Sequence, residues 1–187
     1  MDVDRELAAR AIRGDASAFE ELVRRATRMV FARCVLETGD PQRAEDLTQE
    51  TFLAAWRSIR SLKDPGGFRA WLLRIAQNAC IDARRHDSRL KRGPVIATPV
   101  NEAAPAAEDP LARVESRDRA LAILRSLPED YRLPLTLRYL GGADFESIRL
   151  QMGISPGSLR GLLNRGLQLL RVELKRALGP EFAGGVR

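Results

Sequence analysis

The chain has 187 residues and carries 31 Lys and Arg against 25 Asp and Glu, a formal net charge of +6. With 44% apolar and 30% charged residues it has enough apolar side chains for a packed core, which excludes wholesale disorder. Its length suits one medium domain or two small helical domains. The positive excess suits a polyanionic partner without identifying one.

The N-terminus is charged from its second residue, Asp2. This excludes an ordinary signal peptide, and no apolar run reaches the ~18 residues that cross a bilayer. We therefore expect no membrane insertion and a cytoplasmic location. The Gly14-Asp15 break ends a first helix. Ser17 and Glu20 then predict a capping box for a second helix, whose apolar residues recur at steps of three and four.

Two further helices are expected in the first half of the chain. Asp40 is placed to cap the third helix, with Pro41 at its first position and apolar residues continuing to Ile59. The fourth opens after the break at residues 64–67 and runs into an arginine-rich end. The sequence predicts that residues 1–92 form one helical domain.

The amino-acid composition changes after residue 92. Residues 93–112 are rich in Pro and Ala and predict a flexible linker. Residues 113–179 return to helical periodicity, and residues 180–187 are a tail. Within the second domain, a short helix near 144–152 ends at Gly153, and a long leucine-striped helix follows Pro156. We therefore predict an all-α protein whose C-terminal domain is a helix-turn-helix.

The second helix of a helix-turn-helix lays its first turns in the major groove, so exposed residues there are candidate DNA contacts. An alternative is that basic residues in this helix offset its dipole and keep it solvated. The candidates that lie off the leucine stripe are Ser158, Arg160, Asn164 and Arg165.

A second basic cluster follows the fourth helix, where Arg84 and Arg85 begin an arginine-rich end that Arg69 and Arg74 extend backwards. Such a helix can lie along a nucleic-acid backbone, or it can simply be a solvated exit into the linker. Asp46, Gln49 and Glu50 share one face of the third helix. That acidic and polar face can dock a basic partner, or it can be an ordinary solvated surface.

Little in the sequence indicates catalysis. Cys34 and Cys80 lie in apolar helical patterns without metal-ligand spacing, which favours buried thiols over a disulfide or a metal site. His86 is the only histidine, and no phosphate-cradling glycine loop is present. We predict no catalytic residue, no metal and no cofactor.

Taken in order, three N-terminal segments and the C-terminal helices resemble the sigma factors of bacterial RNA polymerase, in particular the extracytoplasmic-function (ECF) group. The match includes an acid-Leu-x-Gln-Glu-x-Phe segment and a Trp-Leu-x-x-Ile-Ala-x-Asn-x-x-x-Asp segment. The segments that carry it are GDASAFEELV, AEDLTQETFLAAWRSI, FRAWLLRIAQNACIDARR and LPEDYRLPLTLRYLGG.

The resemblance implies a role for each surface. Asp46, Gln49 and Glu50 fall where sigma factors hold the coiled coil of the polymerase beta-prime subunit. The loop at 61–67, with Lys63, falls where a flipped base of the minus-ten element is captured. The fourth helix would follow the opened strand through Arg69, Arg74, Asn78, Arg84 and Arg85. The C-terminal helix-turn-helix would read the minus-thirty-five element, and the beta flap and an anti-sigma factor are further implied partners.

The second domain departs from the family pattern at two places. Arg149 stands where the family usually has a small residue in the first helix of the helix-turn-helix, and Leu162 replaces an arginine that normally faces DNA. Losing such an arginine removes ~1 to 3 kcal/mol of base discrimination or a phosphate contact. The promoter preference therefore stays open, and so does whether the second domain reads an upstream element at all.

The sequence predicts a non-enzymatic specificity subunit that binds core RNA polymerase and directs promoter recognition, melting and initiation. Two rival functions stay open. One is a free-standing helix-turn-helix regulator, which would bind duplex DNA without polymerase. The other is an adaptor that binds polymerase but does not read promoters, which the altered second domain would permit.

Overall fold

The computed structural model describes residues 3–90 and 122–178. All regular structure in these two ranges is helical, which confirms the predicted all-α class. The predicted linker at 93–112 and the tail at 180–187 lie outside the described residues. No helix in the described ranges is long and apolar enough to cross a membrane.

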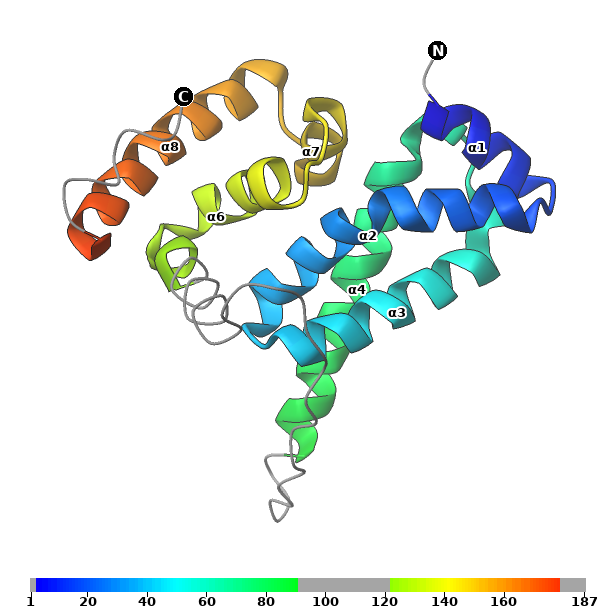
Figure 1. Cartoon of the computed structure of the whole chain (residues 1–187), viewed down its shortest axis with the longest axis horizontal. Helices are drawn as coiled ribbons and strands as arrows, with labels where there is room; N and C mark the ends of the chain where they lie inside the picture. The colour runs from blue at the N-terminus through cyan, green and yellow to red at the C-terminus, as the bar shows by residue number, and fades with distance from the viewer. Residues whose placement is uncertain (1–2, 91–121, 179–187) are drawn as a thin grey trace, which may run out of the picture.

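The N-terminal half is a helical bundle centred on one long helix (Figure 1). Helix α2 packs against α1, α3 and α4, and two short 3-10 turns connect α3 to α4. The bounds are α1 Val3–Ile12, α2 Ala16–Thr38, α3 Pro41–Ser58, η1 Ile59–Ser61, η2 Pro65–Gly67 and α4 Phe68–Leu90.

Helices α2 and α3 each begin with an aspartate side chain that accepts a hydrogen bond from backbone amides of the first turn. One of these two caps differs from the sequence prediction. The predicted cap of α3 is confirmed: the Asp40 carboxylate accepts from the Gln42 and Arg43 backbone amides at 2.9 and 3.3 Å, ahead of Pro41. The predicted capping box of α2 is wrong. Asp15 caps this helix by accepting from the Ala18 amide at 3.0 Å, because its carboxylate stands directly before the first turn.

The bundle core contains the side chains that the periodicity predicts. Leu22 and Leu72 are fully buried, and the Phe19 and Trp56 rings close one side with centroids 4.9 Å apart. Cys34 and Cys80 are buried free thiols, as predicted. A hydrogen bond with Cys34 and burial together raise the pKa of the Cys80 thiol, which keeps it protonated.

The C-terminal half continues the helical architecture and contains the predicted helix-turn-helix. Pro134 lies inside α6, and the helix continues as one π-helical turn in which the Gly141 amide donates to the Thr136 carbonyl at 2.9 Å. Gly153 ends α7 at a φ of 65°, a left-handed conformation that favours glycine. Helical residues 122–126 precede α6 Glu129–Leu135, η3 Thr136–Leu140, α7 Phe145–Met152 and α8 Pro156–Leu178.

The two halves pack against each other. Helix α2 contacts α6 and η3, and α4 contacts α7. Leu135 and Leu137 of the C-terminal half belong to the same hydrophobic cluster as Met29 and Val30 of α2. In Figure 1 the C-terminal helices accordingly lie beside α2 and the first half of α4, while α8 lies on the far side of α6.

Candidate polymerase-binding and nucleic-acid interfaces

The three predicted docking residues are exposed on α3, but they face two different depressions. Asp46 and Glu50 line a groove of about 970 Å3 between α3 and α4, which we call the α3–α4 groove. Gln49 lines a separate hollow of about 690 Å3 between α2 and α3, beside Phe31. The three side chains therefore flank the ridge of α3 rather than forming one flat face.

The opposite wall of the α3–α4 groove comes from α4 and carries two of the predicted DNA contacts. Asn78 and Arg85 line it. An ion pair between Arg43 and Asp87, at 2.6 Å, joins the two walls. The structure thus brings residues from two separately predicted surfaces into one groove. Both walls carry both signs of charge, with Arg43 beside Asp46 and Glu50 on α3 and Asp82 beside Arg85 on α4.

The remaining cations of this half are mostly accessible. Lys63 is exposed in the loop before α4, and Arg74 is exposed on α4 itself. Arg84 lies 3.6 Å from Glu37, and Arg85 lies 3.7 Å from Asp82. Exposed ion pairs of this kind contribute little, so these guanidinium groups can exchange a carboxylate for a phosphate at small cost.

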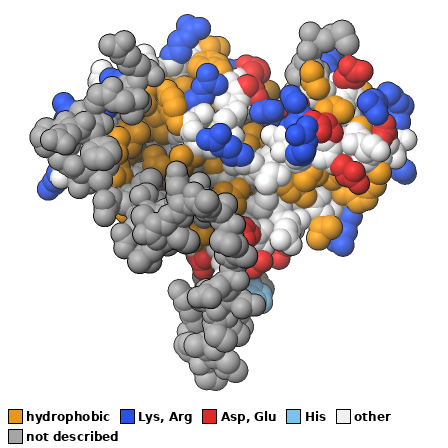
Figure 2. Space-filling model, viewed as in Figure 1, with side chains coloured by type: hydrophobic (Ala, Val, Ile, Leu, Met, Phe, Trp, Pro, Cys, Tyr) orange, Lys and Arg blue, Asp and Glu red, His pale blue; other side chains and the backbone are white. Residues whose placement is uncertain are grey.

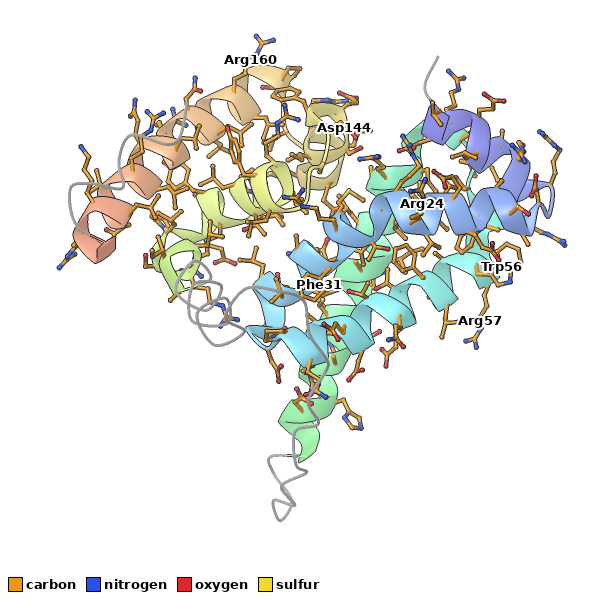
Figure 3. All side chains as sticks on the ribbon, in the orientation of Figure 1. Arg24, Phe31, Trp56, Arg57, Asp144 and Arg160 are labelled. Carbon is orange, nitrogen blue, oxygen red and sulfur yellow. The ribbon has the colours of Figure 1, made fainter. Side chains whose placement is uncertain are left out.

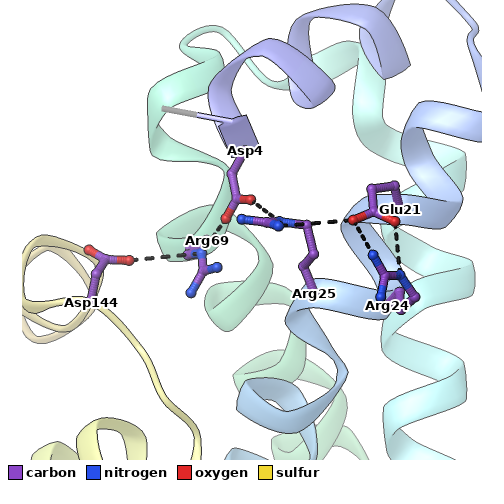
Figure 4. A network of polar contacts seen from close by, with 6 residues as sticks. All are labelled: Asp4, Glu21, Arg24, Arg25, Arg69 and Asp144. Carbon is purple, nitrogen blue, oxygen red and sulfur yellow. Dashed lines mark hydrogen bonds and ion pairs between the residues drawn. The ribbon is translucent and has the colours of Figure 1, made fainter. Parts of the chain in front are cut away.

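Arg69 differs from the other predicted DNA contacts because carboxylates surround it (Figure 4). Its Nε donates to Asp4 at 2.5 Å and lies 3.9 Å from Asp144 of the C-terminal half. Asp4 also accepts from Arg25 at 2.6 Å, and only 20% of the Arg69 side chain is exposed. In this conformation Arg69 is a structural ion-pair residue, and sequence reasoning gave no role to its partner Asp4.

Asp4 holds its charge despite its burial. Burial alone would raise the pKa of this carboxyl, but hydrogen bonds from Arg25 and Arg69 outweigh it and lower the pKa below its ordinary value. A carboxyl whose pKa is lower in the folded than in the unfolded chain stabilises the fold as long as it is ionised. This stabilisation is fully present above the unfolded-state pKa and is lost as the pH falls through the folded-state pKa. The Asp4 pairs therefore stabilise the fold at neutral pH and weaken in acid.

Asp4→Asn is expected to lower the free energy of unfolding by ~1 to 3 kcal/mol at pH 7, because two guanidinium groups lose their carboxylate. The difference in free energy of unfolding between the variant and the wild type should be largest above about pH 5 and should shrink as the pH falls below about 4. Urea denaturation across this pH range measures it. Glu6→Gln, an exposed change on the same helix, is the control; a gap independent of pH would contradict the assignment.

The predicted contacts of the helix-turn-helix all lie on the exposed first turns of α8: Ser158, Arg160, Asn164 and Arg165. Figure 3 shows Arg160 pointing away from the body of the molecule. Ser158 has a local role as well, since its amide donates to the Ser155 Oγ at 3.1 Å and the two hydroxyls lie 2.8 Å apart. The Arg165 guanidinium lies against Gly161, where a Cβ would be 3.4 Å from it.

The two departures from the family pattern leave the helix-turn-helix intact. The Arg149 side chain remains on the surface side of α7, where its Nε and Nη2 donate to Glu146 at 2.8 and 2.5 Å. Leu162 is half-buried on α8. Neither substitution removes the turn at Gly153 that joins α7 to α8.

Charge on the face drawn in Figure 2 is mixed, with Lys and Arg interspersed among Asp and Glu over the described surface. No broad patch of one charge sign is seen among the described residues on this face. Nucleic-acid contact on this face must therefore depend on particular side chains. The fold and its surfaces define a class: a helical protein with a DNA-binding helix-turn-helix and a separate groove suited to a charged partner.

Comparison with known proteins agrees with this class. Sigma-70 region 2 matches residues 19–90, and Sigma-70 region 4 matches residues 117–170. The RNA polymerase sigma-H factor of Pseudomonas aeruginosa is 31% identical over 96% of this chain and 96% of its own. CarQ of Myxococcus xanthus is 38% identical over 84% of this chain and 90% of its own. The match to the ECF sigma factor SigE of Mycolicibacterium smegmatis, 34% identical, covers 84% of this chain and 63% of that relative.

Solved structures give the same fold. CnrH, in its complex with the cytosolic domain of CnrY, matches with a TM-score of 0.65 and 26% identity over 94% of this chain and 99% of that chain. The sigma factor RpoE of Bartonella quintana, solved with the anti-sigma factor NepR, has a TM-score of 0.59 at 20% identity over 84% of this chain and 96% of that chain. The chain therefore belongs to the RNA polymerase sigma factors, in the ECF group, which direct promoter recognition and transcription initiation.

Proposed function

We propose that the α3–α4 groove is where this sigma factor holds the coiled coil of the polymerase beta-prime subunit. Asp46 and Glu50 supply the charge from the α3 wall, and Gln49 contacts the same partner from the ridge beside them. The observation that carries this proposal is that both carboxylates are exposed in a groove large enough for side chains of a basic helix. Electrostatic complementarity of this kind speeds association and sets its register.

The minus-ten element would be opened and read beside this groove. The loop at 61–67, with exposed Lys63, captures a flipped base, and Arg74, Asn78, Arg84 and Arg85 follow the single strand along α4. Unstacking a base costs a few kcal/mol, which backbone charge and a pocket must offset. The accessible guanidinium groups of Arg84 and Arg85 support this role. Arg69 joins this surface only if it leaves its carboxylate partners.

The C-terminal half would read upstream duplex through Ser158, Arg160, Asn164 and Arg165, and contact the beta flap. We place the division between the domains at residues 92 and 113, with 93–112 threading the polymerase. In this role the chain acts in the cytoplasm, and the polymerase performs the phosphoryl transfer. An anti-sigma factor is a further proposed partner, supported by the complex of Bartonella quintana RpoE with NepR.

Start-site mapping tests the proposal. Purified chain is added to core polymerase on a randomised promoter library, and transcript ends are sequenced with and without it. New start sites with a shared upstream sequence are expected. If the chain co-elutes with polymerase but start sites do not change, it is an adaptor that does not read promoters. If it binds duplex DNA but not polymerase, it is a free-standing regulator.

A further inference from the structure

Two thiols meet in the core of the N-terminal bundle, on helices that pack side by side although they are far apart in the chain. Cys34 lies on α2 and Cys80 on α4, and both belong to the same buried cluster. Neither side chain is more than 2% exposed. The Cys80 thiol donates a hydrogen bond to the Cys34 sulfur. The two sulfur atoms are therefore already in contact in the reduced chain.

The surroundings of the two thiols make them chemically unequal. The hydrogen bond from Cys80 and the charge of Arg33 lower the pKa of the Cys34 thiol, although burial opposes them. The same hydrogen bond and burial raise the pKa of Cys80. Cys34 consequently loses its proton first, and the thiolate is the form of cysteine that attacks an oxidant. Cys80 stays protonated beside it, as a second thiol within reach.

Arg33 supplies positive charge next to this pair from inside the core. Its residue is only 5% exposed, and its Nη1 donates to the Glu37 carboxylate at 2.6 Å. Its Nε is buried without a hydrogen-bond partner among the described residues. A buried guanidinium with an unused donor favours negative charge in its surroundings. Cys34, the next residue in the chain, can provide that charge as a thiolate.

The thiol pair lies close to the floor of the α3–α4 groove. Thr48 of α3 is within hydrogen-bond range of the Cys34 sulfur, so α2, α3 and α4 all meet at this point. Leu47 and Ala79, the chain neighbours of Thr48 and Cys80, line the groove itself. Hydrogen peroxide is little larger than water, so a brief local opening of the packed helices admits it to the sulfurs.

We propose that Cys34 and Cys80 are a peroxide-sensitive dithiol that forms a reversible disulfide between α2 and α4. The Cys34 thiolate attacks one oxygen of hydrogen peroxide, the O–O bond breaks, and the products are a sulfenic acid and, after proton uptake, water. The Cys80 sulfur then attacks the Cys34 sulfur and displaces its hydroxyl as a second water. Two thiols thus lose two electrons to one peroxide, and a thiol reductant reverses the step.

The disulfide would add a covalent link beside an existing ionic one. Glu37 follows Cys34 by one turn of α2, Arg84 follows Cys80 by one turn of α4, and the two charged groups lie 3.6 Å apart. Oxidation therefore ties α4 to α2 just before the arginine-rich end of α4. Because the tie restricts the unfolded chain, the oxidised bundle should unfold at a temperature about 5 °C or more above that of the reduced bundle. This inference goes beyond the proposed function and needs neither polymerase nor DNA.

Mass spectrometry of the full-length chain tests the disulfide. The chain is treated with hydrogen peroxide, denatured and alkylated with iodoacetamide, with and without prior reduction by dithiothreitol. We expect both cysteines to escape alkylation, a linked peptide pair containing Cys34 and Cys80, and full alkylation after reduction. Two free thiols after treatment would overturn the proposal. Irreversible oxidation of Cys34 without a link to Cys80, or a link between two chains, would also overturn it.

Single-cysteine variants test which thiol reacts first. Cys80→Ala should stop at a sulfenic acid on Cys34, which dimedone traps, whereas Cys34→Ala should leave Cys80 unreacted. The opposite pattern would overturn the assignment of Cys34 as the attacking thiol. Thermal unfolding of the wild type before and after peroxide measures the effect of the link. Cys80→Ala, treated in the same way, is the matched control because its methionines are oxidised equally. A rise confined to the wild type and lost on reduction is expected; no rise would overturn the tie between α2 and α4.

Discussion

Reversing the charge of Asp46 and Glu50 to lysine is expected to abolish co-elution with core RNA polymerase and, with it, initiation. Both carboxylates are exposed in the α3–α4 groove, so the reversal acts on binding rather than on folding. Opposing a charged contact costs ~2 kcal/mol or more for each residue, and two such losses weaken binding roughly a thousandfold. Gel filtration with core polymerase and run-off transcription measure the two effects.

Glu6→Lys with Glu20→Lys is the matched control for this variant. It also reverses two exposed carboxylates, on α1 and α2, and it changes net charge by the same amount. It should retain co-elution. If both double variants lose polymerase, the effect belongs to net charge; if neither does, the groove is not the docking site.

The parts of the fold that depend on near neighbours in sequence were predictable. Asp40 and Pro41 start α3 as expected, and Gly153 ends α7 before the turn of the helix-turn-helix. These signals act through hydrogen bonds and backbone geometry within a few residues. The predicted cap of α2 was wrong because two candidate capping residues, Asp15 and Ser17, lie within one turn of each other. The sequence pattern alone did not show which of them caps the helix.

What the sequence did not predict depends on residues far apart in the chain. Arg69 meets Asp4 and Asp144 only after three helices have packed, so its place in a basic run gave no sign of its carboxylate partners. Gln49 and Glu50 are adjacent in sequence, yet they face different depressions because α2 packs on one side of α3 and α4 on the other. The composition of a helix face predicts exposure, but the neighbouring helices decide what that face can bind.

The second large effect is expected from the first turns of α8. Arg160→Ala with Arg165→Ala should weaken binding of the polymerase-bound factor to a promoter carrying its upstream element, at least tenfold near 0.1 M salt. Each lost phosphate contact also lowers the slope of log affinity against log salt by ~0.9, so the slope should fall by about 1.8. Fluorescence anisotropy over a salt series measures both quantities.

Lys175→Ala with Arg176→Ala makes the comparison decisive, because it removes the same charge from the last turns of the same helix. Those two side chains are exposed, but they lie far along α8 from the turn that precedes its N-terminal end. This control should keep most of the affinity and the full slope. Equal losses in the two variants would mean that α8 attracts DNA only through its overall charge. A loss confined to Arg160 and Arg165, despite Leu162 between them, would mean that the first turns of the altered helix still contact the upstream duplex.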